Sequence, residues 1–171
     1  MKKLHTITIP PLSGKKLIKD SKLFSWIDPD FVNYGASEAG SETEAGNFDV
    51  LELTKDMTFK EMFQENQAMT QEQILYFVEN HKEKLKQDNY AIFFLFKSEG
   101  NFFVAYVNVN PDGLNVNVNR FENSFVWDAG GGPRFVVPQL ADTLSLNPLD
   151  LDQRVKQLES DMEKIKKIIN L

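Results

Sequence analysis

The sequence predicts an α+β fold in which an antiparallel β-meander sheet is packed by a helix and followed by a C-terminal coiled-coil helix. Three observations lead to this prediction. Five short runs rich in Phe, Val, Ile and Tyr lie between residues 90 and 140, separated by turn residues. An amphipathic stretch follows a helix start at Thr70, and a heptad pattern occupies residues 150–171. The composition, with 42% hydrophobic and 26% charged residues, is that of a globular protein.

The sequence divides into four parts by composition. Residues 1–47 contain a basic N-terminal arm and, at 36–47, an acidic loop with almost nothing to bury, which we expect to be mobile. Residues 48–140 form the α+β domain. Residues 141–149 are a linker, and residues 150–171 are the coiled-coil helix.

The charge is distributed unevenly along the chain. Residues 1–22 carry six lysines against Asp20 alone, a net charge of +5, and because the whole chain carries −6, the remainder carries −11. An acidic body repels phosphate backbones, so we expect no nucleic-acid binding except through the basic residues 2–22. The simpler interpretation is that these lysines are solvated or neutralise the acidic body.

The first two runs of the expected meander, 92–96 and 102–109, are apolar on both faces, so we expect both faces of the sheet to be covered. A helix over residues 71–87 covers one face. The other cover comes from the N-terminal segment, the C-terminal helix or a second copy of the chain.

The turn at residues 110–113 leaves two registers open for the following hairpin. A type I turn with a glycine bulge pairs Asn110 with Leu114. The hydrophobic pattern instead pairs Val109 with Leu114. We favour the register set by the turn.

An asparagine row follows this turn. In either register Asn115, Asn117 and Asn119 share one face of the strand. Asn is disfavoured in strands, so its repetition suggests a hydrogen-bonding surface for a protein partner or a carbohydrate. The simpler interpretation is a solvated outer face.

A glycine-rich loop precedes the last run. Its exposed amides and a nearby guanidinium group are compatible with an anion site formed by Gly130, Gly131, Gly132 and Arg134. The loop lacks the spacing of a phosphate-binding loop, and the simpler interpretation is a glycine hairpin loop.

Apolar residues with four-three spacing define a heptad seam near the C-terminus: Leu151, Val155, Leu158, Met162, Ile165 and Ile169. An isolated helix of this length is marginal in water, so its stripe needs a partner. In a parallel pairing Arg154 faces Glu159 of the other copy, which is attractive. We expect self-association, as a homodimer or homotrimer. The alternative is that the stripe packs on its own domain.

Catalytic motifs are missing from the sequence. There is no Cys, which excludes thiolate chemistry, and neither a nucleophile elbow nor a His-Glu-x-x-His pair nor a dinucleotide fingerprint occurs. We expect neither cofactor nor metal. No segment approaches the ~20 apolar residues of a membrane helix, so we expect a cytoplasmic protein without membrane contact.

The stretch from residue 93 to 140 resembles an uncharacterised conserved domain of hypothetical proteins from small-genome candidate-phylum bacteria. The matching segments are FFLFK (93–97), FFVA (102–105), DGL (112–114), RFE (120–122), VW (126–127) and VVPQL (136–140). The resemblance implies a genuine domain in this stretch. It implies no activity, cofactor or catalytic residue.

These observations favour a non-catalytic protein-interaction module that is oligomerised through a short C-terminal parallel coiled coil. Two alternatives are a carboxylate-dependent hydrolase with its site in a cleft of the sheet, and a phage or mobile-element structural protein trimerised by the same helix. The hydrolase requires two acidic side chains near each other in a concave pocket.

Overall fold

The computed structural model describes residues 1–86, 90–139, 156, 159 and 162. Its strands are β1 Lys2–Ile9, β2 Trp26–Ile27, β3 Gly46–Glu52, β4 Ile92–Ser98, β5 Asn101–Asn110, β6 Gly113–Arg120 and β7 Arg134–Pro138. Its α-helices are α1 Asp30–Asn33, α2 Phe59–Met62 and α3 Gln71–Asn80. Short 3₁₀ helices are η1 Ile18–Asp20, η2 Glu65–Gln67, η3 Lys82–Lys84 and η4 Ala129–Gly131.

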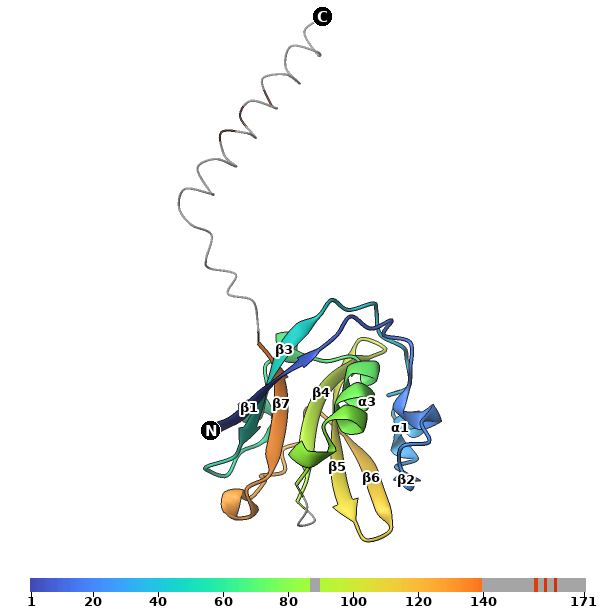
Figure 1. The fold of residues 1–171 in the computed structure, drawn as a ribbon, viewed down its shortest axis with the longest axis vertical. Coiled ribbons are helices and arrows are strands. Elements are labelled where there is room, and N and C mark those ends of the chain that lie inside the picture. Colours follow the sequence, from blue (N-terminus) through green and yellow to red (C-terminus); the bar gives the residue numbers. More distant parts are fainter. Residues whose placement is uncertain (87–89, 140–155, 157–158, 160–161, 163–171) are drawn as a thin grey trace, which may run out of the picture. The chain divides into compact units, whose positions relative to one another are not determined.

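The strands form one seven-stranded mixed sheet in the order β1-β3-β7-β4-β5-β6-β2 (Figure 1). The α+β class is confirmed, but a purely antiparallel meander is wrong, because β7 pairs with β4 in parallel and β2 pairs with β6 in parallel. The chain returns after β6 along residues 121–133, and β7 then enters between β3 and β4. This placement sets Phe93 beside Phe135 and Phe94 beside Val136.

One of the five apolar runs is not a strand of the sheet. Residues 124–128 make only an isolated bridge, in which Trp127 pairs with Met57. The run instead lies over the sheet, where Trp127 packs at 4.6 Å between ring centroids against Phe93. Trp127 therefore serves as cover for the sheet.

The N-terminal residues belong to the same compact unit as the rest of the sheet, which spans Met1–Gln139. β1 pairs with β3 along its length, so the domain boundary expected at residue 47 does not appear in the structure. The basic character of this segment is partly neutralised locally. Lys3 lies 2.8 Å from the Asp49 carboxylate, and Lys16 lies 3.6 Å from that of Glu72.

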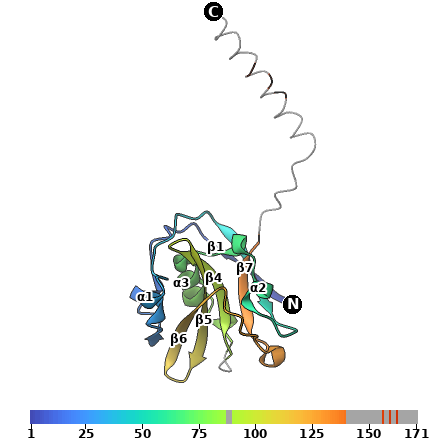
Figure 2. The same cartoon turned by 180° about the vertical axis from the view of Figure 1, so that it is seen from behind.

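Both faces of the sheet are covered, as the apolar strands predicted. On one face α3 lies across β4 and β5, with Ile74, Phe77 and Phe94 in the core between them (Figure 1). On the other face the cover is α2 and the segment 121–129. Figure 2 views the molecule from this side and shows α2. Of the three sources that the sequence suggested, the N-terminal segment lies on the first face instead, where Ile7, Ile9 and Ile18 join the core cluster that contains α3.

Helix α3 begins as the sequence predicts and ends earlier. The amide of Gln73 donates to the Thr70 hydroxyl at 3.2 Å, and the Gln73 side chain accepts from the Thr70 amide at 2.9 Å. The predicted end near residue 87 is wrong, because His81 has φ −129° and ψ 41° and leaves the helical conformation. A turn of 3₁₀ helix, η3, follows.

The acidic loop 36–47 has buried contacts that its composition did not suggest. Ala36 is fully buried, and the side-chain amide of Gln71 donates to the carbonyl groups of Ala36 and Glu38 at 3.2 and 3.1 Å. The loop also pairs with the N-terminal segment through a bridge between Leu12 and Thr43. The expectation of a loop with almost nothing to bury is therefore corrected.

The linker 141–149 and most of the expected coiled-coil helix lie outside the described residues. Lys156, Glu159 and Met162 are described, and each is helical and exposed. In the part of the chain that the structure describes, every helix is too short or too polar to cross a lipid bilayer.

Candidate binding surface

One face of the β5–β6 hairpin carries five asparagine side chains. Strand alternation places Asn108 and Asn110 on the same face of β5, and their partners across the hairpin are Asn115 and Gly113. We call this surface the asparagine face and define it as Asn108, Asn110, Asn115, Asn117 and Asn119. All five side chains are partly buried.

The opposite face of the same hairpin fixes this orientation. Val107 and Val116 are paired and buried in the core under α3, as is Val118 opposite Ala105. The register is therefore the one set by the hydrophobic pattern, with Val109 opposite Leu114, and the register that we favoured from the turn is wrong. A one-residue slip would move the valines out of the core.

Trp26 borders the asparagine face on its β2 side. It pairs in parallel with Asn115, so the two side chains lie on the same face, while the neighbouring Ile27 pairs with Val116 toward the core. The Trp26 side chain is 44% exposed. The solvent-exposed indole ring of Trp26 thus lies next to the amide groups of the asparagine face.

An aromatic cluster borders the asparagine face on the other side. Tyr106, the partner of Asn117, lies 5.5 Å from Trp127 between ring centroids, and Trp127 lies 5.0 Å from Phe125. Phe125 is 58% exposed and Val126 54%. Burial raises the pKa of Tyr106, and the negative charge of Asp28 adds to this, so its hydroxyl group stays neutral at physiological pH.

A hollow of about 430 Å³ opens beside Trp26, at the tip of the hairpin. It is lined by Ser25, Trp26, Asn110, Asp112 and Asn115. The hollow therefore joins one exposed aromatic ring, one carboxylate and two amides of the asparagine face.

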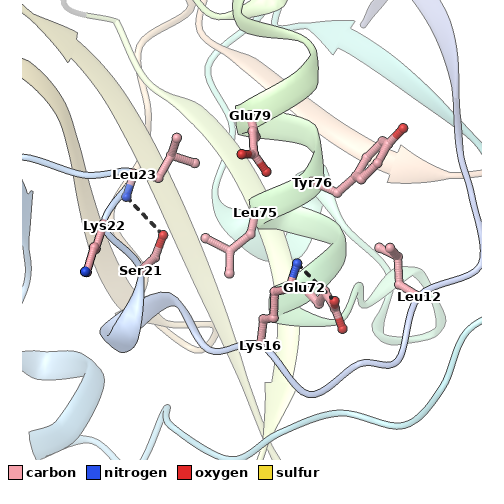
Figure 3. Close-up of a pocket in the computed structure, with 9 residues that line it drawn as sticks. All are labelled: Leu12, Lys16, Ser21, Lys22, Leu23, Glu72, Leu75, Tyr76 and Glu79. Atoms are coloured by element: carbon pink, nitrogen blue, oxygen red, sulfur yellow. Dashed lines mark hydrogen bonds and ion pairs between the residues drawn. The ribbon is translucent and has the colours of Figure 1, made fainter.

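A second cavity, of about 340 Å³, lies between α3 and the N-terminal segment (Figure 3). Its α3 wall carries the acidic side chains of Glu72 and Glu79, with Leu75 and Tyr76 between them. Lys16 and Lys22 line the cavity from the N-terminal segment, and of the two only Lys16 lies beside an acidic side chain, that of Glu72. Two acidic side chains on one cavity wall are what the hydrolase alternative requires, so this cavity tests it.

Glu72 is committed to the fold. Its carboxylate accepts hydrogen bonds from the Ser13 hydroxyl at 2.7 Å and the Lys15 amide at 3.0 Å, and it lies 3.6 Å from the Lys16 ammonium group. Burial alone would raise the pKa of Glu72, but these interactions outweigh it and hold the pKa below its ordinary value.

A carboxylate that such contacts hold in its ionised form is a poor proton donor. In addition, Glu72 and Glu79 are seven residues apart, which corresponds to about 10 Å along a helix. General acid catalysis requires a raised pKa, whereas the pKa of Glu72 is lowered. The cavity therefore gives the hydrolase alternative no support.

The glycine loop expected to bind an anion contains Gly130, Gly131, Gly132 and Arg134. Two amides at its start already bind carboxylates of the protein: Ala129 donates to Asp56 at 2.9 Å and Gly130 donates to Asp128 at 2.6 Å. The guanidinium group of Arg134 donates to the Lys84 carbonyl group at 2.6 Å. The protein's own groups thus occupy much of this site.

Of the six residues predicted to mediate oligomerisation, the structure describes Met162. It is helical and 58% exposed. Leu151, Val155, Leu158, Ile165 and Ile169 lie outside the described residues. No group of three or more His, Cys, Asp or Glu side chains suited to hold a metal ion occurs in the described part of the chain.

The sequence identified Asn115, Asn117 and Asn119 and missed the rest of the surface. Asn108 and Asn110 alternate visibly in residues 102–110, but only the correct register places them on the face that carries the three asparagines of β6. Trp26 gave no pattern, because a strand of two residues is too short for periodicity.

The chain matches no protein-family model, no curated protein and no solved structure. The resemblance of residues 93–140 to an uncharacterised bacterial domain therefore stays a prediction.

Proposed function

We propose that this chain is a non-catalytic protein-interaction module that binds a protein partner through the asparagine face and is joined to further copies through residues 150–171. The observation that carries the proposal is the placement of five uncharged amide side chains on one face, bounded by Trp26 on one side and by Tyr106, Phe125 and Trp127 on the other.

The composition of this surface is that of a protein-binding site. Charged side chains are depleted in the centre of protein interfaces, and aromatic side chains are enriched among the residues that contribute most to affinity. Asparagine adapts to different partners because its amide group both donates and accepts hydrogen bonds. The exposed surfaces of Trp26, Phe125 and Val126 supply apolar area that partner binding would bury.

Self-association gives such a module avidity. In this proposal the heptad seam pairs in parallel, as a dimer or trimer, and Met162 contributes one of its apolar positions. Two or three copies of a weak binding surface then act together at a raised effective concentration. We include the cytoplasmic location expected above in the proposal.

The oligomer is tested by light scattering on the full-length chain at micromolar concentration. We expect a dimer or trimer. The Leu158→Lys variant, which places a charge in the seam, should be monomeric, while the Gln157→Lys variant, which adds the same charge outside the seam, should keep the oligomer. A monomeric wild-type chain would exclude assembly through the seam.

The binding surface is tested separately with the full-length chain as bait in a cell extract of its source. Partners retained by the wild-type chain should be lost with Asn117→Arg, which places a long charged side chain in the centre of the asparagine face. They should be kept with Glu65→Arg, an exposed position on η2. A trimer that retains no partner would favour the structural-protein alternative.

A further inference from the structure

We propose that the hollow beside Trp26 binds an arginine or lysine side chain of the partner, so that the asparagine face recognises a basic segment. This inference rests on the proposed function, since it names the chemistry that the same surface would select. The hollow is lined by Ser25, Trp26, Asn110, Asp112 and Asn115.

The hollow combines the two groups that attract a cation most strongly in water-exposed sites. An indole ring draws a guanidinium or ammonium group to its face, and Trp is the best aromatic side chain for this purpose. The indole of Trp26 is exposed at 44%, and Asp112 supplies a carboxylate on the same hollow. The amides of Asn110 and Asn115 add oxygen atoms that accept hydrogen bonds.

Among the residues that the structure describes, the carboxylate of Asp112 makes neither a hydrogen bond nor an ion pair. The main-chain carbonyl group of Asp112, and not its side chain, accepts the hydrogen bond from the Ser25 hydroxyl at 2.8 Å, which holds the hairpin tip beside β2. Within the described residues the Asp112 side chain forms no ion pair, although it is exposed. The fold thus positions the turn and leaves the charge available to a ligand.

A cationic occupant also fits the charge of the chain. Residues 23–171 carry a net −11, which attracts a basic partner and speeds its encounter. A neutral occupant would remove water from the Asp112 carboxylate without replacing its hydrogen bonds, which is unfavourable. The same type of contact already occurs within the protein, where the guanidinium group of Arg120 lies 4.9 Å from the centre of the Tyr34 ring.

The experiment is a titration of the ¹⁵N-labelled full-length chain followed by nuclear magnetic resonance. The chain has two tryptophans, so its two indole N–H resonances report Trp26 and Trp127 separately. The probes are Nα-acetyl-arginine amide and its citrulline analogue, which has nearly the same shape and no charge. We expect the Trp26 indole to shift saturably with the arginine probe, about fivefold more tightly than with the citrulline probe, and the Trp127 indole to stay unmoved.

Two charge-removing variants complete the test. Asp112→Asn should weaken arginine binding about fivefold, while Glu122→Gln, which removes an exposed charge in the turn that follows β6, should leave it unchanged. Equal binding of both probes, or an Asp112→Asn variant with wild-type affinity, would overturn the inference. So would a Trp26 shift caused by maltose and not by arginine, which would identify a carbohydrate surface.

The same samples separate this inference from the proposed function. Translational diffusion measured in the same tube reports the oligomeric state. A monomer whose Trp26 responds to arginine would retain the cation site and refute assembly through residues 150–171. An oligomer that does not respond would refute the cation site and leave assembly in place.

Discussion

The hydroxyl group of Ser98 accepts a hydrogen bond from the amide of Glu38 at 2.8 Å and donates one to the carbonyl group of Gly35 at 2.9 Å. Ser98 is the last residue of β4 and is 2% exposed. The buried Ser98 side chain therefore links the β4–β5 hairpin to the start of the acidic loop, next to the bond that the Glu99 amide donates to the Glu38 carboxylate at 2.6 Å.

We predict that Ser98→Ala loosens the acidic loop. The substitution leaves the Glu38 amide and the Gly35 carbonyl group without their partner, which costs about 1–3 kcal/mol of unfolding free energy. Hydrogen exchange at the Glu38 amide should become much faster than in the wild type. Ser41→Ala, at an exposed position of the same loop, is the control and should change neither quantity. Unaltered exchange at Glu38 in Ser98→Ala would contradict this role.

We predict that two neighbouring substitutions in β6 change the unfolding free energy by very different amounts. Val116→Asn places an amide in the core under α3 and should destabilise the fold by about 3 kcal/mol, because the amide is buried without a partner. Asn117→Val lies on the asparagine face and should change stability by less than about 0.5 kcal/mol. Urea unfolding measures both. Similar losses for the two variants would show that the hairpin does not have this alternation.

Local sequence information predicted the elements well. The apolar run over residues 92–96 is buried on both faces, and the capping box at Thr70 starts α3 as expected. Both features depend on residues a few positions apart. The end of α3 was missed because Lys82 to Lys84 favour helix, and nothing in the sequence showed that His81 would leave the helical conformation.

Long-range arrangement was not predictable in the same way. Nothing in the segment 134–138 shows that it enters between β3 and β4, because a strand's own residues do not encode which strand becomes its neighbour. The candidate site was affected by one error of register. With Asn110 opposite Leu114, Asn108 would lie opposite Val116, and the five asparagines would not have been recognised as one face.

We predict that Gly113→Ala destabilises the hairpin more than Gly100→Ala does. Both glycines have positive φ, at 122° and 79°, so an alanine is strained at either position. At Gly113 the added methyl group would also lie 2.1 Å from the Ser25 hydroxyl oxygen, whereas at Gly100 it meets nothing within 4 Å. Ser25 must rotate and lose its bond to Asp112, which adds about 1 kcal/mol.

The measurement is a urea unfolding curve for each glycine variant, together with the position of the Trp26 indole resonance. The resonance should move in Gly113→Ala and stay in Gly100→Ala, since only the former disturbs the contact that holds the hairpin tip beside β2. Equal unfolding free energies and unmoved resonances in both variants would mean that the Ser25 contact contributes nothing.

We predict that Glu72 stabilises the fold at neutral pH and loses this effect in acid. Its pKa in the folded state lies below the ordinary value of about 4.3, so its contribution is complete above that value and disappears as the pH falls through it toward the folded-state pKa. Glu72→Gln keeps the shape and removes the charge. It should lower the unfolding free energy by about 2 kcal/mol at neutral pH, because hydrogen bonds to an ionised group are the stronger ones.

The pH series distinguishes the charge of Glu72 from its packing. The difference between wild type and Glu72→Gln should shrink steadily below about pH 4, because the wild-type carboxylate is then protonated as well. Glu79→Gln is the control, since Glu79 lies on the same helix and is exposed, and it should show no comparable loss at any pH. If the Glu72→Gln deficit persisted unchanged into acid, it would come from altered packing among Ser13, Lys15 and α3. The ionised carboxylate would then not be what fastens the N-terminal segment to the helix.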